Sequence, residues 1–197
     1  MLRRECQVDA GTEGTAGTNP VPALQMSYQA IEANLAKARG QLDAALASVP
    51  EADWARKPAA GGWSVGEVLA HLIQVECAVH DAGVKTLAKP PKPLKRGWMP
   101  APIFLIKYRG IKRETPIPLD PALVTSKEEM LAKFAERRQQ TLAFLREALA
   151  NGRDLAGYHW RHPFFGSLTF HQWCRVLASH EIRHTKQIRE IVSSFQS

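Results

Sequence analysis

Cysteine is scarce in this sequence, and its three copies form no recognisable motif. Cys6, Cys77 and Cys174 lie far apart, so there is no C-x-x-C pair of the kind found in metal and redox sites. Cys77 and Cys174 fall within helical patterns, where a buried and reduced thiol is the usual state. This usage favours a reducing compartment, and we expect a cytoplasmic protein.

Long apolar runs are also missing. No apolar stretch follows Met1, and no run approaches the roughly 18 apolar residues of a membrane span. We therefore expect neither a secretory signal nor a membrane partner. The sequence contains no internal repeat, no Gly-rich phosphate loop and little strand pattern. Its 197 residues, 45% hydrophobic and 23% charged, are typical of one globular domain with a sizeable core.

Acidic residues are absent from residues 82–113, although the whole chain holds 19 of them. The basic residues of this segment outnumber the net charge of +7 of the whole chain. Such a run is usually a solvated surface, and the alternative is that it borders a site and attracts an acidic substrate or a thiol cofactor. No helix-turn-helix pattern or aromatic and basic platform accompanies it, so we expect no specific nucleic-acid partner. The basic residues are Lys85, Lys89, Lys92, Lys95, Arg96, Lys107, Arg109, Lys112 and Arg113.

Four segments show the apolar spacing of amphipathic helices. The first extends from Leu24 to Leu46 and ends before Pro50. Residues 1–23 lack periodicity and predict a flexible N-terminal tail. Each of the other three helices opens with the spacing of a capping box, Ser or Thr followed three residues later by Glu or Gln. These pairs are Ser64–Glu67, Ser126–Glu129 and Thr169–Gln172.

The connections between these helices differ in length. Residues 51–62 form a short first loop, whereas residues 89–102 hold five prolines, which forbid a regular helix. The apolar run 103–106 that follows predicts a short helical turn, and the aromatic stretch 158–166 is a linker that leads into the fourth helix. Together they predict an all-α fold, a four-helix bundle with a long crossover between helices two and three, formed by residues 24–197 as a single domain.

The fourth helix places two histidines among its core-facing residues. His180 and His184 lie one turn apart on the face that also carries Phe170 and Trp173, a separation that lets two imidazoles share a metal ion. The alternative is a pair of core histidines satisfied by a neighbouring carbonyl or carboxylate.

The same residues spell H-E-x-x-H, in which Glu181 would be the general base of a metalloprotease. That assignment needs a third ligand, and Glu190 is the sole downstream candidate, within the same helical run. We therefore expect the third ligand upstream. If helices two and four are neighbours, His71 faces His180 and His184, and three imidazoles form the three-ligand site typical of catalytic zinc.

Two stretches carry the pattern of a known family. Residues 62–72, GWSVGEVLAHL, have a tryptophan-serine helix start with a histidine on that helix, and residues 162–188 hold HPFFGSLT followed by HEIRHTKQI. In order and spacing, residues 24–195 resemble the DinB/YfiT-like superfamily of metal-binding four-helix bundles. The resemblance implies a metal triad of His71, His180 and His184. It implies a divalent ion, nickel or zinc first, and imidazole ligands are also compatible with manganese or iron.

The resemblance also implies a range of activities. Characterised relatives of this family include thiol-dependent transferases and a mycothiol-dependent isomerase, and many members have no known activity. We therefore expect a metal-dependent hydrolase or thiol-dependent transferase that acts on a small molecule, with a low-molecular-weight thiol as a candidate partner. The alternative is a non-catalytic, metal-stabilised bundle that acts as a binding or interaction protein. A homodimer is compatible with the sequence.

Other polar residues near the triad receive structural interpretations. Glu181 is rotated about 100° from His180 around the helix axis. This favours a contact with another helix or with a metal-ligating side chain over the role of catalytic base. Gln187 either faces the metal or satisfies a buried carbonyl. Cys77 is expected to point away from His71. The remaining histidines are interpreted as surface or packing residues: His80, His159, His162 and His171.

Overall fold

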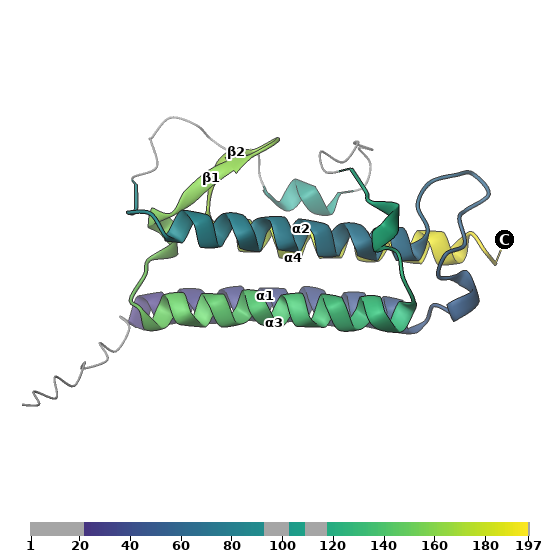
Figure 1. Cartoon of the computed structure of the whole chain (residues 1–197), viewed down its shortest axis with the longest axis horizontal. Helices are drawn as coiled ribbons and strands as arrows, with labels where there is room; N and C mark the ends of the chain where they lie inside the picture. Colours follow the sequence, from purple (N-terminus) through teal and green to yellow (C-terminus); the bar gives the residue numbers. More distant parts are fainter. Residues whose placement is uncertain (1–21, 93–102, 109–117, 197) are drawn as a thin grey trace, which may run out of the picture.

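Four long helices run lengthwise through the computed structural model, which describes residues 22–92, 103–108 and 118–196 (Figure 1). They are α1 (Pro22–Ala47), α2 (Val65–Leu87), α3 (Lys127–Ala150) and α4 (Phe170–Ser193). The predicted all-α four-helix bundle is confirmed. The predicted tail, residues 1–23, lies almost wholly outside the described residues. Within the described ranges, no helix is long and apolar enough to cross a membrane.

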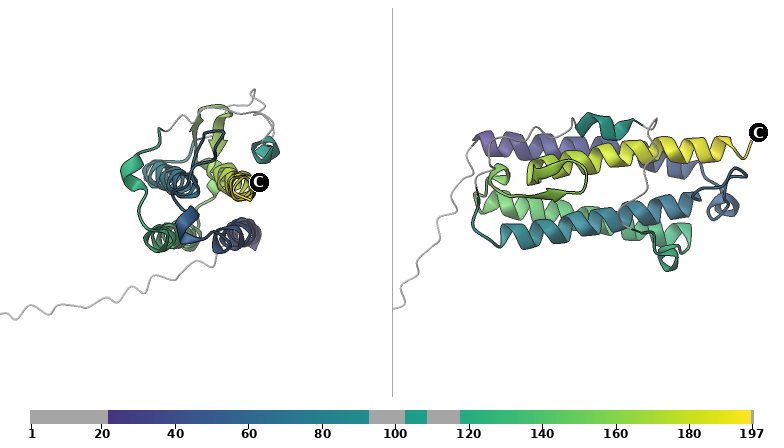
Figure 2. Two further views of the ribbon diagram at one scale, coloured as in Figure 1. Left: turned by 90° about the vertical axis from the view of Figure 1, so that its right-hand side faces the viewer. Right: turned by 90° about the horizontal axis from the view of Figure 1, so that it is seen from above.

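The four helices form a square when viewed along the bundle axis (Figure 2). Helix α2 contacts α3 and α4, and α1 contacts the same two helices, so α1 and α2 lie on one diagonal. Helices α1 and α4 run in one direction and α2 and α3 in the other (Figure 1). The α2–α3 connection must therefore return along the whole bundle, which is the long crossover that the sequence predicts. This connection includes the short 3-10 helices η2 (Ile103–Lys107) and η3 (Pro121–Leu123).

The helix starts follow the capping pattern. Ser64 Oγ accepts from the Glu67 backbone N–H at 3.2 Å, and the Ser64 N–H donates to the Glu67 carboxylate at 2.8 Å. Thr169 and Gln172 make the same reciprocal pair before α4. Before α3, only the forward bond is present among the described contacts, from the Glu129 N–H to Ser126 at 3.3 Å. Of the predicted capping box of Ser126 and Glu129, one of the two bonds is therefore present.

The aromatic linker before α4, where the sequence shows little strand pattern, is part of a β-hairpin. Strand β1 (His159–His162) pairs antiparallel with β2 (Gly166–Thr169), so that His159 lies opposite Thr169. Four-residue strands are too short to show a clear alternation of apolar and polar residues in the sequence. Packing of their side chains on the bundle stabilises the pair. Trp160 stacks on Trp173 of α4 with ring centroids 5.2 Å apart. The hairpin and η2 both lie over the α2–α4 side of the bundle (Figures 1 and 2).

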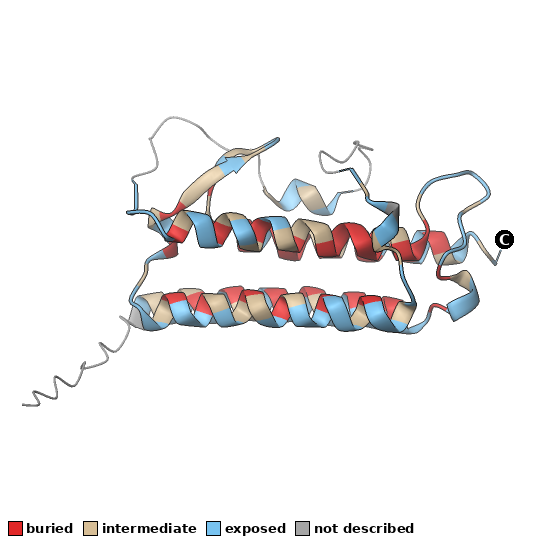
Figure 3. Cartoon of the chain, viewed as in Figure 1, coloured by how far each residue is buried: buried red, intermediate tan, exposed pale blue. Residues whose placement is uncertain are grey.

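The core consists of two apolar clusters, one toward each end of the bundle. The buried residues lie on the inner faces of the helices (Figure 3). Phe170 and Leu145 belong to one cluster, and Phe134 and Ile188 belong to the other. Between them, each helix contributes one charged residue, and together these form what we call the charged layer. Its members are Arg39, Glu76, Arg138 and Glu181.

Replacement of Ser64 by Ala should lower the free energy of unfolding by about 1 kcal/mol, because the first turn of α2 loses its side-chain acceptor. Urea denaturation followed by circular dichroism measures the change. Ser48→Ala is the control, since Ser48 is exposed and its hydroxyl donates to the Ala45 carbonyl at the end of α1. Equal effects of the two substitutions would contradict the capping role.

Candidate metal centre

Three histidines from two helices converge at one point. His71 lies in the second turn of α2, and His180 and His184 lie one turn apart on α4. The Nε2 atom of His180 is 3.3 Å from that of His71 and 3.0 Å from that of His184. The ligand atoms of all three lie within 4.8 Å of one another. The structure thus brings together the three residues that the sequence predicts as a triad.

These separations fit a shared cation. Two nitrogens that each lie about 2.1 Å from one ion are about 3.0 Å apart at a right angle and about 3.4 Å apart at the tetrahedral angle. The observed 3.0 and 3.3 Å fall within that interval. A single N–H on His180 cannot point directly along both contacts, whereas one cation satisfies three lone pairs. The cluster could therefore hold a divalent metal ion.

Burial keeps the imidazoles in the form that a metal requires. His71 is 4% exposed and His184 6% exposed, and His180 is half-buried. Burial lowers the pKa of His71 to about 4. Burial also lowers the pKa of His180 well below its usual value, and the neighbouring His184 and His71 add to the shift. Both rings are consequently neutral at pH 7, with a lone pair available.

Two residues outside the triad fix the orientation of its rings. The His184 Nδ1–H donates to Gln187 Oε1 at 2.9 Å, which leaves Nε2 of the same ring as the acceptor atom that faces the cluster. The Trp63 ring lies 5.1 Å from the His71 ring and stacks on the His184 ring at 6.5 Å, centroid to centroid. Gln187 therefore lies beside the histidine cluster, as the first of its two interpretations predicts. The contact of Trp63 with the histidines is not apparent from its position before the α2 cap.

Glu181 points away from the imidazole cluster. Its carboxylate is 2% exposed and accepts from the Arg138 guanidinium, which comes from α3. Burial raises the pKa of Glu181 to about 7, against the opposing effect of the Arg138 charge. The carboxylate therefore makes a contact between helices, as the rotation along α4 predicts, and the metalloprotease assignment of this residue has no geometric support. Glu190 is exposed, and His71 completes the cluster instead.

Glu76 and Arg138 are buried partners that the sequence interpretation missed. Arg138 Nε and Nη2 donate to the two carboxylate oxygens of Glu76 at 2.8 and 3.0 Å. Burial would lower the pKa of Arg138, but its bonds to Glu76 and the charge of Glu181 raise it above its ordinary value. A sequence signal exists, because Arg138 follows Phe134 by four residues and therefore falls on the inward stripe of α3.

The basic segment borders the helix that carries two of the histidines. Arg183 of α4 donates to the carbonyls of Ile106, at 3.4 Å, and Tyr108, and Lys186 donates to the Lys107 carbonyl at 3.3 Å. These bonds fasten η2 along α4. Residues 103–108 of the basic segment therefore lie along the helix that carries His180 and His184, and an electrostatic role of the segment at the site stays a prediction. Residues 93–102 and 109–113 of this segment lie outside the described part.

His162, His80 and Cys77 do not belong to the three-histidine group, although His162 lies near enough to His180 to add to the lowering of the His180 pKa. His162 packs against Phe165 at 4.7 Å and Trp173 at 4.8 Å, and burial lowers its pKa to about 4. His80 packs against Phe144 at 5.4 Å. Cys77 is a half-buried free thiol that packs on one apolar cluster. These residues have the packing roles that the sequence predicts for them.

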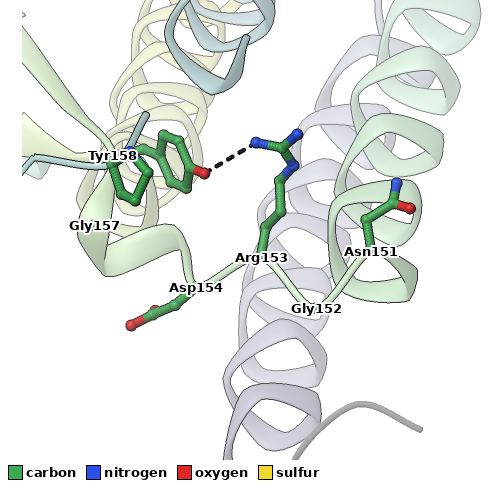
Figure 4. Close-up of a pocket in the computed structure, with 7 residues that line it drawn as sticks. Asn151, Gly152, Arg153, Asp154, Gly157 and Tyr158 are labelled. Carbon is green, nitrogen blue, oxygen red and sulfur yellow. Dashed lines mark hydrogen bonds between the residues drawn. The ribbon is translucent and has the colours of Figure 1, made fainter. Parts of the chain in front are cut away.

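A shallow pocket at the other end of the bundle contains none of the triad (Figure 4). It lies where α3 ends and η4 (Leu155–Gly157) begins. Its only guanidinium, from Arg153, is already engaged, because Nη1 donates to the Leu87 carbonyl at 2.7 Å and to the Tyr158 hydroxyl at 2.9 Å. We interpret this pocket as a structural joint. Its lining residues are Pro91, Asn151, Gly152, Arg153, Asp154, Gly157 and Tyr158.

Comparison with known proteins agrees with this geometry. Residues 34–188, which include all three histidines, match the model of the DinB superfamily. The uncharacterized protein YuaE of Bacillus subtilis (strain 168) is 31% identical over 145 residues, which is 69% of this chain and 81% of that protein. The crystal structure of TT2238, a four-helix bundle protein, has a TM-score of 0.54 at 21% identity and covers 83% of this chain and 98% of its own. The latter likeness confirms the fold.

Removal of His71 should abolish stoichiometric metal uptake, because two imidazoles from one helix leave the ion without its third ligand. Titration of His71→Ala with zinc or nickel, followed by metal analysis, measures the loss. Glu190→Ala is the matched control and should bind like the wild type. The opposite pattern, with Glu190 essential and His71 dispensable, would place the site elsewhere.

Gln187→Leu should weaken metal affinity by about 10- to 100-fold, because His184 loses the acceptor that fixes its ring and tautomer. Competition with a chelator of known affinity measures the change. Gln140→Leu is the control, since Gln140 lies on α3, which carries none of the three histidines, and bonds to Glu136 at 3.0 Å and Arg137 at 2.9 Å within that helix. An unchanged affinity in Gln187→Leu would show that the contact has no role in ligand orientation.

Proposed function

The chain belongs to the DinB superfamily, and we propose that it is a metal-dependent enzyme that uses His71, His180 and His184 to hold one divalent ion. The convergence of one ligand nitrogen from each of three histidines within 4.8 Å is the observation that supports this function. No fourth His, Cys, Asp or Glu joins the group among the described residues, so protein ligands leave coordination positions for other molecules. Nickel or zinc is the proposed ion, with manganese or iron as further candidates.

The proposed reaction is hydrolysis or thiol transfer on a small molecule. When bound, a divalent ion with open positions supplies Lewis acidity, which lowers the pKa of a water or thiol held beside it. The residues of this chain orient the site and shape its surroundings. Gln187 holds the His184 ring, and Trp63 covers one side of the imidazoles with an apolar face.

The charge beside the site favours an anionic reactant. Arg183 and Lys186 lie on α4 next to His180 and His184, and Lys107 lies on the η2 turn that they fasten. Cationic groups at the mouth of a site raise the local concentration of anions. A low-molecular-weight thiol with carboxylate groups is therefore the proposed partner, and such thiols are abundant in the cytoplasm, the compartment that we propose.

A second candidate function is a non-catalytic bundle that the metal stabilises. The observation that favours it is that the cluster bridges two helices, since His71 belongs to α2 and the other two ligands belong to α4. An ion bound at that position would link elements that are distant in the sequence. The chain would then act as a binding or interaction protein.

Metal loading and turnover together separate these functions. At a metal concentration of about 100 times Kd, binding should stabilise the folded state by about 2.7 kcal/mol, which corresponds to a rise in Tm of roughly 5–10 °C. Zinc- and nickel-loaded protein is then assayed with a panel of thiols and electrophiles and with a panel of small esters and amides. Turnover that is lost in His71→Ala supports the enzyme.

Each of the other results has a defined meaning. A rise in Tm without turnover on either panel would favour the metal-stabilised bundle. If the protein shows no rise in Tm and takes up no zinc, nickel or manganese, both functions are contradicted. Turnover that persists in His71→Ala at the wild-type rate would show that the reaction takes place outside the triad.

A further inference from the structure

One guanidinium joins all four helices at the charged layer. Arg138 of α3 makes two bonds to Glu76 of α2, at 2.8 and 3.0 Å, and a third to Glu181 of α4. Its Nη1 also donates to the Leu35 carbonyl of α1 at 3.3 Å. Arg138 is 6% exposed, and Glu76 and Glu181 are each 2% exposed. The guanidinium is therefore fixed in place by partners from every other helix.

The two carboxylates belong to the same helices as the three histidines. Glu181 directly follows His180, and Glu76 follows His71 by five residues, or about 7.5 Å along the helix. One residue turns a helix by about 100° and five residues turn it by about 140°, so each carboxylate lies on a different face from the neighbouring imidazole. Helices α2 and α4 are thus linked twice, through the imidazoles on one side and through Arg138 on the other.

We infer that Arg138 is a positioning residue for the metal centre. Its planar fork fixes the spacing and rotation of α2 against α4, and these bring His71 Nε2 to within 3.3 Å of His180 Nε2. This inference rests on the proposed metal binding. A purely stabilising role explains the arrangement less well, because the desolvation of buried ion pairs offsets much of their attraction. The two parallel bonds from the Arg138 guanidinium to Glu76, in contrast, fix the orientation of the two side chains whatever the net stability of the ion pair.

Substitution of Arg138 by Lys tests this role, because Lys keeps the positive charge but cannot bridge two carboxylates with a planar fork. Zinc affinity is measured by chelator competition, and the ligand geometry by the visible absorption spectrum of the cobalt-substituted protein, both well below Tm. We expect a 10- to 100-fold loss of affinity and an altered cobalt spectrum. Arg146→Lys is the matched control, since Arg146 also lies on α3 but forms an exposed pair with Glu32 at 3.0 Å.

A second variant is used if Arg138→Lys does not fold. The triple substitution Glu76→Met, Arg138→Leu and Glu181→Met replaces the buried ions with apolar side chains, a change that proteins often tolerate. We expect a folded bundle with weakened zinc affinity. A lowered Tm with wild-type affinity and cobalt spectrum in either variant would overturn the inference and leave the metal centre intact. Failure of both variants to fold would also overturn it, because the role would then be stability.

The failure of the proposed function has a different signature. Wild-type protein that takes up neither zinc nor cobalt would overturn the metal centre, and the positioning role with it. Wild-type uptake that Arg138→Lys does not change would overturn only the positioning role. The Arg146→Lys control separates both results from a general effect of charge changes on α3.

Discussion

A buried guanidinium requires acceptors around its plane, and this requirement organises the bundle. Arg138 finds these acceptors on three other helices, at Glu76, Glu181 and the Leu35 carbonyl. A movement of one helix alone would break at least one of these bonds. It would leave a buried charge without a partner, which is strongly unfavourable. The relative depth and rotation of all four helices are therefore coupled at this level, which adjoins the histidine cluster.

Helix direction determines which residues can meet at that cluster. His71 and His180 are 109 positions apart in the sequence, and they meet because α2 and α4 are antiparallel neighbours. The parallel pairing of α2 with α3 requires the long connection, and that connection places η2 on α4 (Figure 1). The basic residues of η2 thus lie beside α4 through topology and not through proximity in sequence.

The sequence predicts the parts of this structure that depend on local pattern. The starts of α2 and α4 follow from their capping boxes, and the pairing of His180 with His184 follows from their helical spacing, whereas His71 joins them through the resemblance to a known family. The β-hairpin depends on aromatic packing between β1 and α4, which four-residue strands do not reveal. The bond from Arg138 to Glu76 depends on which inward-facing residues oppose each other across the bundle. A single helix pattern shows that Arg138 faces inward but does not identify its partner.

The division of the core by the charged layer has a consequence for motion. Each apolar cluster is nearly complete on its own side, with Phe170 in one and Phe134 in the other. Proteins open in cooperative units of different stability, and such units follow contiguous packing. The bundle therefore has two halves that can loosen separately, and amide hydrogens in the two halves can exchange with solvent at different rates.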